Sequence, residues 1–439
     1  MDSKIAGMVS QTEAPLGYDS GWIRGTIVYL GFAATGVGMA LPGSVLPTLL
    51  AQWSMSDSQA GFLFFVGWLG TSLGALLVRP SRVRSAAGGS ALIAAGALGM
   101  AYANRWSCFL WMALFGLGLG LTMTSISLLQ AARHAQRRGM ELNRLNLAWA
   151  LGASACPSLA AHSLRVVNVH AIFSALGIFF GLFCVWALAR EREPEPQGLM
   201  PESGVRQRWG IGSLALWPIS VVAIILLPTG IESSMGGWIA AYVQRTQQAI
   251  STTVTAGTCF WVGLMLSRAL SSLVLRKSGR MERFILRQSL ATVVAGSLLL
   301  IAGTASVSIL PGVFLVGFGL GPVYPLLLAV ALQYSQNTAI FFVAGLGSAI
   351  LPWLTGTVSS ATSSLRWGLL VPFFASLLML ILGLRIGWKG RLKKDGRPAQ
   401  RSMAEDGSDG YNLSVDRNAS GPRPPVSRAI RYCLSERKR

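Results

Sequence analysis

Charged residues are scarce in this chain. They make up 12% of its 439 residues, against about 25% in a typical soluble domain, and only 17 are acidic. That scarcity argues against a soluble globular protein, and the 52% share of hydrophobic residues excludes a disordered one. The 50 glycines follow no Gly-X-Y period, which excludes a collagen. Apolar runs long enough to cross a bilayer recur instead, so we predict a polytopic helical membrane protein.

Patterns that support catalysis or metal binding are also lacking. The five cysteines form no CxxC pair and no Cys/His spacing typical of a metal site. No GxxxxGK[ST] phosphate loop, HExxH pair or Ser/His/Asp order is present. We therefore expect a protein that is not an enzyme, with no bound metal and no cofactor. ATP-driven pumping has no support.

The apolar runs predict twelve transmembrane helices, and therefore an all-α membrane protein. A polar segment rich in Pro and Gly, Arg190–Gly210, divides the spans six and six. We expect a cytoplasmic N-terminus (1–21), a six-helix bundle (22–190), a cytoplasmic linker (191–212), a second six-helix bundle (213–387) and a disordered basic tail (388–439). The predicted spans are Trp22–Leu50, Ser58–Val78, Ser85–Ala103, Ser107–Gln130, Asn143–Ser163, Val169–Arg190, Ser213–Val243, Thr252–Leu275, Phe284–Gly303, Ser308–Gln333, Thr338–Ala361 and Trp367–Gly387.

The net charge of +20 has a topological explanation. Sixteen Lys and Arg residues lie in or beside the loops after spans two, four, six and eight, against four in the loops after spans three, five, seven and eleven. Because basic loops stay inside, both termini are expected in the cytoplasm of a multi-pass protein of the cell membrane. The expected contacts of these charges are membrane lipids, not nucleic acid.

An internal repeat relates the two predicted bundles. AGFLFFVG (Ala60–Gly67) matches AGTCFWVG (Ala256–Gly263), and GLGLG (Gly116–Gly120) matches GFGLG (Gly317–Gly321). LGASACPSL, which begins at Leu151, matches LGSAILPWL in the same order and at nearly the same offset. A parallel repeat of six spans is typical of secondary transporters with a central site between two bundles.

Four segments carry a resemblance to a known family. They are GMALPGSVLPTLL (Gly38–Leu50), GIESSMGGWIAAY (Gly230–Tyr242), GFGLGPVYPLLLA (Gly317–Ala329) and LPWLTGTVSSATSSLRWGLLVP (Leu351–Pro372). The span region resembles the major facilitator superfamily, and in detail the fucose-galactose-glucose:cation symporter family. The resemblance implies a sugar or polyol as solute, with proton or sodium coupling.

Two departures from the family pattern matter for function. The loop between spans two and three keeps Gly74 and Arg84, for which the resemblance implies a gating or structural role, but lacks the usual acidic residue. Bacterial fucose permeases carry an acid in each of spans one and four, where this chain has neither Asp nor Glu. This chain therefore does not offer that acidic pair for proton coupling.

Glu232 is the first candidate for solute binding and ion coupling, because it is the only carboxylate deep inside a predicted span. An acid at mid-bilayer costs about 2.5–3.5 kcal/mol, so it should face a wet cavity or a partner. The preceding Pro228 and Gly230 favour a broken helix there. A structural carboxylate is the alternative. For Arg268 we expect a hydrogen bond that locks helices at the cytoplasmic gate, with snorkelling to the interface nearly as plausible.

Amide and aromatic side chains could complete a sugar site. Asn146 and Trp149 share a face of the fifth span, where an amide can bond hydroxyls and a ring can pack on C–H groups. Interhelical hydrogen bonding is an equally good reading of Asn146. For each aromatic residue taken alone, core packing or an interface position is the better reading. The other candidate aromatic residues are Trp238, Tyr242, Trp261 and Tyr324.

Together these features predict a monomeric secondary transporter that moves a sugar-like small solute by alternating access, coupled to a proton or sodium gradient. An exporter of drugs or amphipathic compounds would suit the same uncharged, aromatic spans. A non-transporting membrane sensor on this scaffold is the alternative of another class. The sequence identifies neither the solute, nor the ion, nor the direction of transport.

Overall fold

The computed structural model of the chain describes residues 18–134, 138–189, 219–246, 248–277, 281–303, 305–334 and 339–385. The regular structure of these residues is helical, with twelve long helices and one short helix. The first set is α1 (Tyr18–Trp53), α2 (Asp57–Leu76), α3 (Arg82–Ala101), α4 (Cys108–Arg133), α5 (Arg138–Val166) and α6 (Val169–Ala189). The second is α8 (Ile219–Arg245), α9 (Ile250–Lys277), α10 (Glu282–Ala302), α11 (Ser306–Tyr334), α12 (Ala339–Thr362), α13 (Leu365–Gly368) and α14 (Leu370–Arg385).

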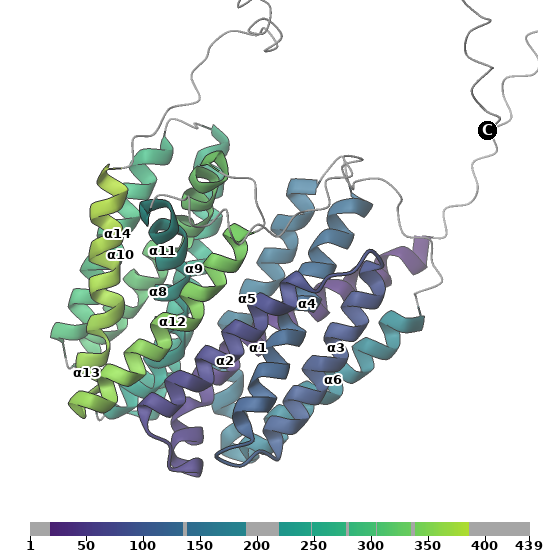
Figure 1. The fold of residues 1–439 in the computed structure, drawn as a ribbon, viewed down its shortest axis with the longest axis horizontal. Helices are drawn as coiled ribbons and strands as arrows, with labels where there is room; N and C mark the ends of the chain where they lie inside the picture. Colours follow the sequence, from purple (N-terminus) through teal and green to yellow (C-terminus); the bar gives the residue numbers. More distant parts are fainter. Residues whose placement is uncertain are drawn as a thin grey trace, which may run out of the picture. The chain divides into compact units, whose positions relative to one another are not determined.

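The helices form two bundles, α1–α6 and α8–α14, which lie side by side (Figure 1). Ten helices are long and apolar enough to cross a membrane by length and composition. The other two long helices are α3 and α5, which begin with charged residues. The prediction of twelve transmembrane helices in two six-helix bundles is confirmed. The predicted linker, Arg190–Gly210, and the predicted tail lie outside the described residues.

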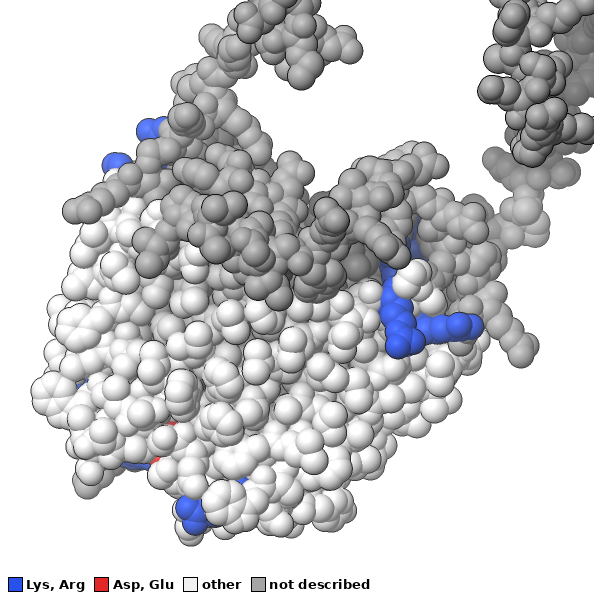
Figure 2. All heavy atoms as spheres, in the orientation of Figure 1, with Lys and Arg blue, Asp and Glu red and all other residues white. Residues whose placement is uncertain are grey.

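The outer surface suits a membrane. On the face drawn in Figure 2, the described surface is almost wholly uncharged, with Lys and Arg near its edges. Helix α6 exposes Ile178, Leu182 and Val185, each more than half accessible. In water such a continuous apolar face would be unfavourable, whereas in lipid it is the expected covering.

Glycines of the first repeat bring α4 close to two neighbours. A Cβ atom at Gly116 would lie 2.0 Å from the carbonyl oxygen of Gly67 in α2, and one at Gly118 would lie 2.6 Å from that of Gly89 in α3. Any larger residue would force these helices apart. Alternate glycines of GLGLG therefore face two different helices.

The second repeat builds the same contacts in α11. A Cβ atom at Gly317 would lie 2.1 Å from the carbonyl oxygen of Phe260 in α9, and one at Gly319 would lie 2.8 Å from that of Ser289 in α10. Helices α2, α3 and α4 thus correspond to α9, α10 and α11. In both bundles these glycines are therefore sites of close helix packing.

Candidate functional site

An ion pair joins Glu232 of α8 to Arg268 of α9. A guanidinium nitrogen of Arg268 donates to Glu232 Oε2 at 3.0 Å, and Arg268 Nε donates to the carbonyl oxygen of Gly321 in α11 at 3.0 Å. The Glu232 side chain is 18% exposed and the Arg268 side chain is 29% exposed. Arg268 therefore links three helices of the second bundle, while Glu232 keeps a partly open face. The sequence did not indicate that these two candidates meet.

Neither Glu232 nor Arg268 lines the two cavities found between the bundles, but each shares a helix face with a residue that does. Glu232 lies one turn from Gly236 on the same face of α8, and Arg268 lies two turns from Trp261 on the same face of α9. Gly236 and Trp261 line both cavities. Tyr324 of α11, half-buried, interacts electrostatically with both members of the pair.

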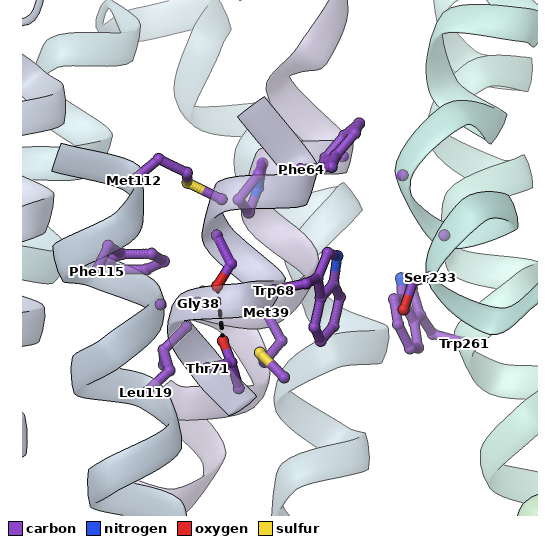
Figure 3. Close-up of a pocket in the computed structure, with 16 residues that line it drawn as sticks. Gly38, Met39, Phe64, Trp68, Thr71, Met112, Phe115, Leu119, Ser233 and Trp261 are labelled. Carbon is purple, nitrogen blue, oxygen red and sulfur yellow. Dashed lines mark hydrogen bonds between the residues drawn. The ribbon is translucent and has the colours of Figure 1, made fainter. Parts of the chain in front are cut away.

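The smaller cavity has a volume of about 30 Å³. In Figure 3, Met39 and Trp68 of the first bundle lie opposite Ser233 and Trp261 of the second. This volume holds one or two water molecules but no sugar. We call the larger space, of about 320 Å³ between α1, α5, α8 and α9, the interbundle cavity. Its volume falls in the range of about 300–1,000 Å³ usual for ligand sites.

Two of the predicted aromatic residues meet across the bundle interface. The rings of Trp149 in α5 and Trp261 in α9 pack edge to face, with centroids 5.8 Å apart. Trp149 Nε1 is buried without a hydrogen-bond partner in the described part of the chain. Asn146, one turn before Trp149, is exposed. The predicted cluster on α5 thus lies beside the aromatic wall of the cavities.

Two more of the predicted aromatic residues, Trp238 and Tyr242, are buried. The Trp238 ring packs edge to face on Phe64 of α2 in the first bundle, with centroids 5.8 Å apart. Trp238 is fully buried, and its Nε1 donates to the carbonyl oxygen of Pro352 at 3.0 Å. Tyr242 is 3% exposed, and its hydroxyl donates to the carbonyl oxygen of Leu300 at 3.0 Å. Neither lines the two cavities described above. Both residues are therefore packed in the protein core, as expected for an aromatic residue taken alone.

Gly74 and Arg84 lie at the junction of α2 and α3. A Cβ atom at Gly74 would come within 2.0 Å of the carbonyl oxygen of Leu117, so this glycine allows α2 to approach α4 closely. Arg84 is exposed in the first turn of α3, and its backbone N–H is capped by the Ser81 hydroxyl. These contacts set the local helix packing.

A second carboxylate, Glu141, is buried and was not predicted. Helix α5 begins at Arg138, earlier than the expected Asn143, and this extra turn places Glu141 inside the protein at 5% exposure. Its carboxylate accepts from the Tyr29 hydroxyl of α1 at 2.5 Å and from Arg144 at 2.8 Å. Glu232 is therefore not the only acid removed from solvent. The sequence held one signal for a helix here, because Glu141 and Arg144 are three residues apart, a spacing at which opposite charges pair on a helix.

Polar contacts join the bundles at one end, where α1 ends and α2 begins; we call this end the closed side. Both guanidinium NH2 groups of Arg245 in α8 donate to the two carboxylate oxygens of Asp57 at 2.6 Å each. The Ser359 hydroxyl of α12 also donates to Asp57, at 2.5 Å. The backbone N–H of Ser58 donates to Ser360 Oγ at 2.7 Å.

Repeat-related glycines bring the bundles together on the same side. A Cβ atom at Gly61 of α2 would lie 3.0 Å from Trp353 Cα of α12. The equivalent Gly257 of α9 would place a Cβ atom 3.0 Å from Pro157 Cβ of α5. The two glycine-bearing motifs therefore contact the two proline-bearing motifs across the interface. The contact pairs α2·α12 and α9·α5 are related by the repeat.

The chain has relatives among membrane transporters. The sequence profile of the Major Facilitator Superfamily matches residues 28–342, and the chain belongs to that family. It is accordingly a multi-pass membrane transporter and not an enzyme. No curated protein matches the sequence.

Solved transporter structures share the fold. A point mutant of the nucleoside transporter NupG aligns with a TM-score of 0.64 and 11% identity, over 82% of this chain and 99% of that one. The xylose transporter XylE from E. coli, in an inward open conformation, aligns with a TM-score of 0.61 and 17% identity, over 82% and 95%. A partially occluded inward open conformation of XylE aligns with a TM-score of 0.62 and 15% identity, over 82% of this chain and 97% of that one.

Proposed function

We propose that the chain is a secondary active transporter of a sugar-like solute, driven by a proton or sodium gradient. The superfamily fold gives the transport class, and the similar fold of a xylose transporter favours a sugar. The motif Glu232-Ser-Ser-Met-Gly-Gly-Trp favours the fucose-galactose-glucose:cation symporter branch.

The observation that carries the proposal is the ion pair of Glu232 with Arg268. The carboxylate is partly open and belongs to the helix face that borders both cavities. A proton or sodium ion that binds Glu232 competes with the guanidinium for the same oxygens. Arg268 also holds the carbonyl oxygen of Gly321 in α11, so loss of the pair changes a three-helix contact. That link supplies a physical route from cation binding to helix movement.

Alternating access follows from the arrangement of the bundles. We propose that the closed side faces the outside of the cell, with both termini in the cytoplasm, as the distribution of basic loops favours. Breaking the Asp57–Arg245 contacts and separating α2 from α12 would open that side. The transporter then works as a monomer surrounded by lipid, since both bundles of one chain form the pathway.

Aromatic and amide groups suit a sugar. The edge of the Trp149–Trp261 pair can pack against C–H faces, while the exposed Asn146 can bond hydroxyl groups. We assign Tyr324 to the same lining, because its hydroxyl lies near the Glu232–Arg268 pair.

Transport in proteoliposomes tests the proposal. Radiolabelled xylose, glucose, galactose and fucose would be offered to vesicles with an imposed pH gradient, an imposed sodium gradient, or neither. We expect one cation gradient to drive accumulation of at least one sugar, and an ionophore that collapses that gradient to abolish it. Uptake of no sugar, together with extrusion of amphipathic dyes, would contradict the proposal in favour of an exporter.

A further inference from the structure

The interbundle cavity contains a positive charge with no partner. Arg165, at the end of α5, lines the cavity and is exposed, and its side chain makes no hydrogen bond or ion pair within the described residues. No Asp or Glu is found among the described residues that line this cavity. In contrast, Arg245 and Arg268 are both paired with carboxylates. The cavity therefore favours an anion.

Neutral hydrogen-bonding groups surround the same space. Thr253 Oγ1 of α9 is buried and has no hydrogen-bond partner in the described part of the chain. Thr48 of α1 and Gln244 of α8 also line the cavity, and their side chains form no bond with other described residues. A buried hydroxyl left unpaired costs free energy, so a ligand that bonds Thr253 gains by removing that cost.

Phe260 and Trp261 form the aromatic part of the apolar lining of the cavity. One guanidinium, several hydroxyl or amide groups and an aromatic face together match a small molecule with a carboxylate, several hydroxyls and a C–H face. The volume of about 320 Å³ accommodates a molecule of monosaccharide size.

We propose that the interbundle cavity binds a sugar acid, with its carboxylate on Arg165 and its hydroxyls on Thr253, Thr48 and Gln244. That the ligand resembles a sugar rests on the proposed function. That it carries a negative charge rests on the position of Arg165 in the cavity. Gly43, Gly236 and Trp261 are shared with the small cavity, so the site continues toward the helix face of Glu232. It is a binding position separate from the Glu232–Arg268 pair.

Calorimetric titration of the purified full-length protein tests this site. The ligands are sodium gluconate and glucose, with sodium chloride present at matched ionic strength. We expect gluconate to bind the wild type more tightly than glucose. Arg165→Gln should weaken gluconate binding by roughly tenfold to a hundredfold and leave glucose binding unchanged. The melting temperature of this variant without ligand should stay that of the wild type, because Arg165 has no partner to lose.

A further variant locates the carboxylate. Arg105→Gln removes one positive charge outside the cavity, where Arg105 bonds Gln59, and should leave gluconate binding unchanged. An equal affinity for gluconate in Arg165→Gln and the wild type would overturn the inference, as would the absence of gluconate binding. Sugar uptake that persists in either case would leave the proposed function standing.

Discussion

A leucine in place of Gly61 should force the closed side open. The Cβ atom would lie 3.0 Å from both Cα and the carbonyl oxygen of Trp353, and 3.1 Å from the carbonyl oxygen of Pro352. These are backbone atoms of α12, so they cannot swing aside, and the longer leucine branch increases the overlap. Overpacking of this kind costs about 1–3 kcal/mol. The cost applies only while α2 and α12 touch, so it shifts the equilibrium toward the open state by roughly 5- to 150-fold.

Gly257→Leu should have the same effect through the repeat-related contact. Its Cβ atom would lie 3.0 Å and 3.1 Å from the ring carbons Cβ and Cγ of Pro157 in α5. Gly181→Leu is the matched control, because a Cβ atom there meets nothing within 4 Å. The control should retain the distribution of states found in the wild type.

Double electron–electron resonance, which measures the distance between two spin labels, can detect the opening of the closed side. Tyr102 and Val307 suit cysteine substitution, because they are 80% and 86% exposed and lie on the closed side of the first and second bundle respectively. The five native cysteines would first be replaced by alanine. Gly61→Leu and Gly257→Leu should each populate a longer label distance. An unchanged distribution in both variants, or the same lengthening in Gly181→Leu, would show that these glycine contacts do not hold the closed side shut.

Three other predictions concern the closed side, the tail and the topology. Asp57→Asn removes the two-point contact with Arg245. Because the Arg245 side chain is 42% exposed, solvent screening limits the lost interaction energy to about 1 kcal/mol. The same spin labels should report a roughly fivefold shift toward the open state. Deletion of Lys389–Arg439 should leave membrane insertion and transport intact, whereas loss of insertion would make this segment part of the fold. Reporter fusions at both termini and within Arg190–Gly210 should give a cytoplasmic signal; an external signal at one terminus alone would contradict the twelve-span topology.

The architecture was predictable because membrane insertion imposes strong rules on sequence. Apolar runs fix the spans, and matched motifs such as those at Gly116 and Gly317 relate the bundles. Those glycines turned out to make equivalent contacts with neighbouring helices. The predicted helix ends were less accurate. Helix α5 begins at Arg138, in a polar turn that apolar periodicity does not detect, and this turn contains the buried Glu141.

The candidate site was only partly predictable, because side-chain pairing depends on how helices rotate about their axes. Glu232 and Arg268 were chosen separately, and only the structure brings them together. The same limit explains Trp238, which is buried against Phe64 and Pro352 and lines neither cavity, whereas Trp261 lines both. The unpaired position of Arg165 likewise requires knowledge of which side chains surround a cavity.

In the proposed mechanism, ion coupling passes through Glu232. Glu232→Gln keeps the size of the side chain and its ability to bond Arg268, but removes the charge that a cation neutralises. The variant should still fold, and solute counterflow without a gradient should partly survive. The decisive measurement is gradient-driven accumulation of the solute in vesicles that contain this variant. We expect accumulation to be abolished. Accumulation at the wild-type level would show that coupling does not pass through Glu232, and would leave this residue as a structural partner of Arg268.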